Sequence, residues 1–147
     1  MPILALDRIK VGATAVSKTD AIRQAGQLLV KSGCVEPTYI DGMLAREETM
    51  STYLGNGVAI PHGQYDNRTD IHQTGISVLQ IPQGVEWEDG EKAYLVIGIA
   101  AFSDEHVGVL ANLAEVIEDE EITNQLIHTT DPAFILSQLG KERTEEI

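Results

Sequence analysis

The sequence predicts an α/β or mixed α+β sandwich, because segments with strand-like and helix-like patterns alternate along the chain. Residues 95–101, LVIGIAA, are apolar at every position, as in a central strand that is buried on both faces. Apolar residues recur at helical spacing in residues 21–29 and again in residues 107–117. No repeat or Pro/Gly-rich linker divides the chain. We therefore expect residues 1–147 to form a single domain, with a frayed tail at 140–147.

The N-terminal part of the chain is expected to hold a short extended segment and two helices. The extended segment covers residues 3–11. The first helix starts at Ser17 or Thr19 and ends before Gly33, a residue that is typical of the position just after a helix. A second helix follows Pro37, which suits a first helical turn. Its apolar face consists of Tyr39, Ile40, Met43 and Leu44.

The middle of the chain is expected to form a turn, a short strand and a loop. The Gly-Asn-Gly sequence at residues 55–57 is a turn signal, and the apolar residues 58–60 that follow it indicate a short strand. Pro61 has no N–H group to donate, so it ends regular pairing. Residues 64–73 are polar and are expected to form a loop.

One more strand and two short helices complete the prediction. The strand covers residues 76–81 and is closed by Pro82 and Gly84. Beyond the helix at residues 107–117, apolar spacing predicts helices at residues 122–128 and 132–139.

The composition predicts a soluble cytoplasmic domain. Cys34 is the only cysteine, so no intrachain disulfide can form, which fits a reducing compartment. The N-terminus lacks the basic and apolar regions of a signal peptide, and the longest apolar stretch, residues 94–102, is too short for a membrane span of about 20 residues. The chain has 10 basic and 23 acidic residues, a formal charge of −13. This charge argues against nucleic acid or anionic lipid as partners, because both require a basic surface.

The negative charge is concentrated in residues 86–121, which hold 11 acidic residues and one basic residue, Lys92. Two interpretations stay open: a solubilising surface, or a surface that steers a basic partner protein. Trp87 lies in this segment and is expected to be a packing anchor within an acidic loop.

The histidines are the candidates for chemistry, because the chain has no Gly-rich phosphate loop, no paired cysteines and no H-E-x-x-H motif. His62 follows an apolar strand and Pro61, and precedes Gly63, which would leave space beside the ring. A nucleophilic imidazole needs such a rigid mount, an open face, and one nitrogen held as N–H while the other attacks. The alternative is a turn histidine without a role.

His106 is the second candidate, because it follows the buried strand and stands at the start of a helix. Strand ends and helix N-termini are places where α/β proteins bind anions. The alternative for His106 is a solvated residue near a helix cap. His72 and His128 are expected to be surface residues, and Cys34 is expected to be a small packing residue rather than a reactive thiol.

A metal-dependent alternative uses His62 and His106 with Asp104 or Glu105 as a set of two histidines and one carboxylate. No local ligand spacing in the sequence supports such a set. We therefore predict neither a metal nor a cofactor.

Residues 54–63, LGNGVAIPHG, resemble the active-site signature of the type-2 EIIA components of the bacterial phosphoenolpyruvate-dependent sugar phosphotransferase system. This group has mannitol, fructose and nitrogen-regulatory members. The signature begins with an acidic or amide residue seven positions before the leucine, and Glu47 fits that position. Further segments resemble the mannitol-type members, so the resemblance covers roughly residues 6–139: TDAIRQAGQLLVKSGCVEPTYIDGMLARE, YLVIGIAA, DEHVGVLANLAEVIEDEE and IHTTDP.

The resemblance implies a mixed β-sheet of about five strands with helices on both faces. It places the phosphorylated histidine of the family on His62, its second active-site histidine on His106 and its active-site arginine on Arg46. The implied activity is metal-independent transfer of a phosphoryl group from phospho-HPr to a cysteine of a cognate EIIB, for mannitol uptake. We expect Nε2 of His62 to be the attacking atom, with Nδ1–H held by a backbone carbonyl.

Two features of the sequence depart from the mannitol type. The Asn56-Gly57 pair resembles the nitrogen and fructose branches, and Phe102 stands where mannitol-type members often have an arginine. A regulatory EIIA, which signals by its phosphorylation state, therefore stays open as an alternative. A non-catalytic binding domain is a third possibility.

Overall fold

The computed structural model describes residues 4–88, 90–101 and 103–139, and for residues 65–66 and 103–110 it describes the backbone alone. Within these residues, five strands form a mixed sheet in the order β1-β4-β5-β3-β2. The strands are β1 (Ile9–Lys10), β2 (Tyr53–Gly55), β3 (Val58–Ala59), β4 (Gly75–Glu88) and β5 (Glu91–Ala100).

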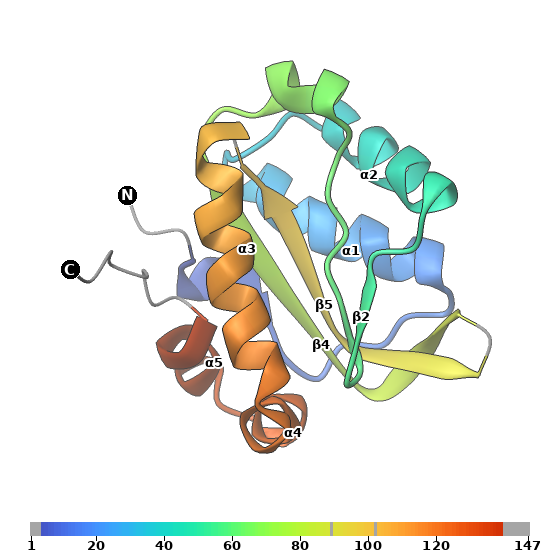
Figure 1. Cartoon of the computed structure of the whole chain (residues 1–147), viewed down its shortest axis with the longest axis vertical. Helices are drawn as coiled ribbons and strands as arrows, with labels where there is room; N and C mark the ends of the chain where they lie inside the picture. The colour runs from blue at the N-terminus through green and yellow to red at the C-terminus, as the bar shows by residue number, and fades with distance from the viewer. Residues whose placement is uncertain (1–3, 89, 102, 140–147) are drawn as a thin grey trace.

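Helices cover both faces of this sheet (Figure 1). One face packs against α1 (Lys18–Lys31) and α2 (Thr38–Thr49). The other packs against α3 (Ser103–Glu118), α4 (Glu120–His128) and α5 (Pro132–Leu139). The predicted fold class, a mixed sheet of about five strands between two helical layers, is therefore confirmed.

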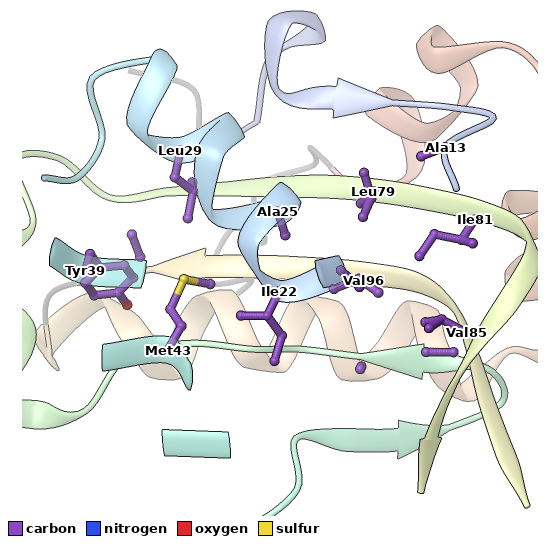
Figure 2. Packing of buried hydrophobic residues seen from close by; sticks show 14 of the residues in the cluster. Ala13, Ile22, Ala25, Leu29, Tyr39, Met43, Leu79, Ile81, Val85 and Val96 are labelled. Atoms are coloured by element: carbon purple, nitrogen blue, oxygen red, sulfur yellow. The ribbon is translucent and has the colours of Figure 1, made fainter. Parts of the chain in front are cut away.

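Strand β5 is the centre of the sheet, as the apolar run at residues 95–101 predicts, although the strand starts earlier, at the exposed Glu91. It pairs antiparallel with β4 and parallel with β3. Its alternate side chains enter two different cores: Val96 faces α1 and α2, whereas Ile97 and Ile99 face α3, α4 and α5. Figure 2 shows the first of these cores, where α1 lies across β4 and β5. Burial on both faces makes β5 a rigid support for the residues attached to its end.

The caps of α1 follow the predicted start and stop signals. Ser17 is the N-cap, and its Oγ accepts a hydrogen bond of 3.1 Å from the N–H of Asp20. Gly33 has φ +84°, and its N–H and that of Cys34 donate to the carbonyls of Val30 and Leu29. This pair of bonds is a Schellman motif, which requires a left-handed residue and explains the glycine. Cys34 is buried, as expected of a packing residue.

The prediction of a strand closed at Pro82 is wrong, because β4 continues through Pro82 and Gly84 to Glu88. A shift of register between Gln80 and Val85 accommodates Pro82 outside the ladder, where its missing N–H costs no hydrogen bond. Trp87 therefore lies buried in a strand and not in a loop.

Two other segments differ from the prediction. Residues 3–11 do not form one extended segment: a 3-10 helix, η1 (Leu6–Arg8), precedes β1, whose ladder with β4 is only two residues long. The expected polar loop contains a second 3-10 helix, η2 (Tyr65–Asp70), which starts with a capping box between Gln64 and Asn67. Short 3-10 helices leave little trace in hydrophobic spacing, because they consist of a single turn or two.

Candidate functional site

His62 is attached to the central strand. It forms a parallel bridge with Ile99, near the end of β5, and the carbonyl of Pro61 accepts a hydrogen bond of 3.0 Å from the N–H of Ile99. Pro61 is buried and His62 is half-buried. The backbone of His62 is thus bonded to the central strand of the sheet, although β3 itself ends at Ala59.

The imidazole of His62 is held in one tautomer by its own strand. Its Nδ1 lies 2.9 Å from the carbonyl oxygen of Ile60. A carbonyl oxygen only accepts, so Nδ1 carries the proton and the lone pair of the neutral ring is on Nε2. In this tautomer the lone pair is on the nitrogen that is expected to attack.

Tyr39 links the backbone next to His62 to β5 through hydrogen bonds, a role that sequence reasoning missed. Its hydroxyl donates to the carbonyl of Ile99 at 2.8 Å and accepts from the N–H of Gly63 at 2.9 Å. A Cβ atom at Gly63 would lie 2.6 Å from Cε1 of Tyr39. The packing of Tyr39 is thus one reason for a glycine at this position. The sequence places Tyr39 on a buried helix face but does not link it to a residue 24 positions away.

The buried hydroxyl of Tyr39 predicts a loss of stability in alkali. Burial, more than the charge of Asp70, raises the pKa of Tyr39 from 10.0 to about 12. The folded state therefore favours the neutral phenol. This contribution is complete below pH 10 and is lost as the pH rises towards 12; two pKa units correspond to about 2–3 kcal/mol.

Urea unfolding of the native protein and of Tyr39→Phe at a series of alkaline pH values measures this effect. The free energy of unfolding of the native protein should fall more steeply between pH 10 and 12 than that of the variant. Parallel pH dependences for the two proteins would contradict the prediction.

Arg46 lies in the last turn of α2, at the junction with the segment that leads to β2. Its Nη1 donates a hydrogen bond of 2.7 Å to the carbonyl of Met50. Two residues further on, the carbonyl of Thr52 accepts from the N–H of Ile60 at 3.0 Å. Through this pairing, the structure places the end of α2 beside the strand that carries His62.

His106 lies in the first turn of α3, but its side chain is outside the described part of the structure. The backbone of α3 nevertheless shows which segments lie near residue 106. Helix α3 begins at Ser103, directly after β5 ends at Ala100, and His62 is bridged to Ile99 at the same end of β5. The strand end thus brings the first turn of α3 and the segment of His62 to one end of the sheet. Phe102 also lies outside the described residues.

The other histidines are on the surface, as expected. His72 is exposed, and its Nε2 lies 2.5 Å from the Oε2 of Glu36, itself an exposed group. His128 is exposed near the end of α4, with Nδ1 2.8 Å from the carbonyl of Asn124.

The metal alternative receives no support from the side chains that the structure describes. Among them, no three His, Cys, Asp or Glu residues are grouped so as to hold a metal ion. The other proposed ligands, His106 with Asp104 or Glu105, have side chains outside that description.

Comparison with known proteins identifies the family. The model of the family "Phosphoenolpyruvate-dependent sugar phosphotransferase system, EIIA 2" matches residues 2–142. The chain belongs to the EIIA 2 family. Its matched region contains all three residues that the resemblance singles out, His62, His106 and Arg46.

Similar proteins include one of about the length of this chain and one that is much longer. The mannitol-specific phosphotransferase enzyme IIA component of Bacillus subtilis is 44% identical over 127 residues, which cover 86% of this chain and 89% of that protein. The multiphosphoryl transfer protein of Escherichia coli O157:H7 is 45% identical over 145 residues, 98% of this chain. The chain spans only 39% of the length of that relative.

A solved structure shows the same fold. The complex of enzyme IIA Mtl and phosphorylated enzyme IIB Mtl from Escherichia coli contains a chain that matches with a TM-score of 0.87 and 40% identity. The match covers 92% of this chain and 95% of that chain. In the part of this EIIA 2 chain that the structure describes, no helix is both long enough and apolar enough to cross a bilayer.

Proposed function

We propose that the protein is a cytoplasmic phosphocarrier in which His62 accepts a phosphoryl group from phospho-HPr and passes it to a cysteine of a cognate EIIB. The observation that carries this proposal is the bond between Nδ1 of His62 and the carbonyl of Ile60, which leaves Nε2 as the nucleophile. Mannitol is the proposed sugar, since a mannitol-specific IIA component matches over most of both chains.

The reaction consists of two displacements at phosphorus. In the first, Nε2 of neutral His62 attacks the phosphoryl group, so the Nε2–P bond forms while the bond to the donor breaks. In the second, the thiolate of the EIIB cysteine attacks, so a P–S bond forms and His62 regains its lone pair. The Nδ1 proton stays on the ring in both steps, and the carbonyl of Ile60 stabilises the positive charge of the phosphorylated imidazole.

Catalysis then depends on charge at the phosphoryl oxygens, because the transition state of such transfers is loose and spreads charge over them. We assign this role to His106, in the first turn of α3, and to Arg46, whose guanidinium offers a fork of donors. The N–H groups of Gly63 and Gln64 are already bound within the protein, to Tyr39 and Asn67. The stabilising donors therefore come from side chains more than from this loop.

Sequential incubation tests the proposed function. The purified protein is phosphorylated with phosphoenolpyruvate, enzyme I and HPr, separated from them, and mixed with a mannitol-type EIIB. We expect the phosphoryl group to move to the EIIB cysteine. A protein that is never phosphorylated, or one that cannot pass its phosphoryl group to EIIB, would contradict the proposal.

The acidic residues of the β4–β5 hairpin, Glu86, Glu88 and Glu91, lie far from His62 along the sheet. The hairpin is at the opposite end of β5 from Ile99, which is bridged to His62 (Figure 1). Eight residues of strand separate Ile99 from Glu91, about 26 Å at about 3.3 Å per residue. This distance is several Debye lengths at physiological salt, where one is about 8 Å.

Neutralising the hairpin should therefore leave phosphoryl transfer unchanged. We expect the triple variant Glu86→Gln, Glu88→Gln, Glu91→Gln to accept the phosphoryl group from phospho-HPr within about twofold of the native rate at physiological ionic strength. Rapid-quench measurements at several salt concentrations check this. A tenfold slower variant would show that HPr contacts the hairpin.

The regulatory alternative loses the feature that favoured it, the Asn56-Gly57 pair. Asn56 has φ 52° and Gly57 has φ 80°, so the pair forms the kind of tight turn, with two positive φ values, that joins β2 to β3. The Nδ2 of Asn56 also donates to the carbonyl of Ile117, in α3, at 3.0 Å. Turn geometry and this contact explain the pair without reference to signalling.

A further inference from the structure

Glu47 is a buried carboxylate one residue from Arg46, in the last turn of α2. Its side chain is 3% exposed. The carboxylate accepts hydrogen bonds from the hydroxyl of Thr52 at 2.6 Å, from the N–H of Thr52 at 3.1 Å and from the indole N–H of Trp87 at 3.0 Å. The ammonium of Lys18 lies 3.8 Å away at the surface. Three donors converge on this group, so its position is closely fixed.

The bonds to Thr52 continue to the imidazole of His62. Glu47 holds Thr52 by its N–H and its hydroxyl, while the carbonyl of Thr52 accepts from the N–H of Ile60 at 3.0 Å. The carbonyl of the same Ile60 lies 2.9 Å from Nδ1 of His62. A continuous series of hydrogen bonds thus runs from Glu47 through Thr52 and Ile60 to His62.

We propose that Glu47 is a positioning residue for phosphoryl transfer. By holding Thr52, Glu47 fixes the position of Ile60, whose carbonyl selects the Nδ1–H tautomer of His62. Because Glu47 follows Arg46 in α2, the same contacts fix Ile60 relative to Arg46. The inference rests on the proposed function of His62.

Glu47→Ala and Glu47→Gln separate positioning from charge. Gln retains an oxygen for the N–H groups of Thr52 and Trp87, and its own N–H can donate to the Thr52 hydroxyl. We expect Glu47→Ala to slow single-turnover transfer from phospho-HPr about tenfold or more, with an unchanged apparent KM for HPr, because the nucleophile is misplaced and the docking surface is not. Glu47→Gln should stay within about threefold of the native rate.

A readout at the ring distinguishes positioning from general destabilisation. The ¹⁵N chemical shifts of the His62 imidazole report the tautomer, and Glu47→Ala should lower the population of the Nδ1–H form, whereas Glu47→Gln should preserve it. Ser77→Ala is the matched control, since it removes another buried hydrogen bond, of 2.8 Å to the carbonyl of Ala25. This control should lose stability but keep the native rate and tautomer.

Thr52→Val and Trp87→Phe keep the inference testable if Glu47→Ala does not fold. Each removes one side-chain donor to Glu47, but only Thr52 lies in the series that leads to His62. We expect Thr52→Val to be the slower of the two in transfer. Equal rates for this pair, a native rate and tautomer in Glu47→Ala, or a Glu47→Gln as slow as Glu47→Ala would overturn the inference. If the native protein accepts nothing from phospho-HPr, the proposed function itself fails.

Discussion

A His62→Ala protein takes up no phosphoryl group from phospho-HPr under conditions in which the native protein is fully modified; this is the largest effect we expect. In the proposed mechanism Nε2 of His62 forms the bond to phosphorus, so the variant lacks the nucleophile. The fold should survive, because the ring is half-buried and its described hydrogen bond goes to the backbone of its own strand. Intact-protein mass spectrometry after incubation with phosphoenolpyruvate, enzyme I and HPr measures the uptake.

His72→Ala and His128→Ala are suitable controls for this experiment. Both histidines are exposed, so their removal should leave uptake and stability at native levels. A His62→Ala protein that still gains one phosphoryl group would assign the acceptor to another residue. A much lower midpoint of thermal unfolding for His62→Ala would show that the ring stabilises the fold more than the structure indicates.

His106→Ala should have the second largest effect, a rate of phosphoryl transfer about 10² to 10³ times lower, as when one charge-stabilising donor is lost. The first turn of α3 follows directly on the end of β5 to which His62 is bridged. We propose that His106 donates to the phosphoryl oxygens, on which charge develops in the transition state. The modification should still end on His62, because the nucleophile is intact.

Rapid-quench measurement of a single turnover from phospho-HPr determines this rate. His128→Ala is the matched control, because it removes an imidazole from the exposed end of another helix. A His106→Ala protein that transfers at the native rate would remove His106 from the catalytic site. Uptake that moves to a different residue would show that His106 and His62 do not share one site.

The elements with strong local signals could be predicted from the sequence. Strand β5 was recognisable because residues 95–100 are all apolar, and α1 because Ser17 and Gly33 mark its two ends. The continuation of β4 past Pro82 could not be predicted, because it depends on a register shift against β5 that no local pattern encodes. Here a long-range pairing overrides a strong local breaker signal.

The candidate site was predictable to a similar extent. The strand, the proline and the glycine around His62 made it a candidate, and the family resemblance adds its expected tautomer, Arg46 and His106. The support provided by Tyr39 and Glu47 could not be found in this way, because it depends on tertiary packing. Tyr39 reaches Gly63 and Ile99, while Glu47 meets an indole 40 positions away. Such contacts exist only once the helices lie against the sheet.

The position of the phosphorus atom on the ring tests the central claim most directly. ¹⁵N-histidine-labelled protein is phosphorylated through enzyme I and HPr and analysed by ¹⁵N and ³¹P NMR. We predict one phosphohistidine, at residue 62, with phosphorus on Nε2 and the proton retained on Nδ1. Phosphorus on Nδ1, on another residue, or on none would contradict the claim that the carbonyl of Ile60 prepares this imidazole for transfer.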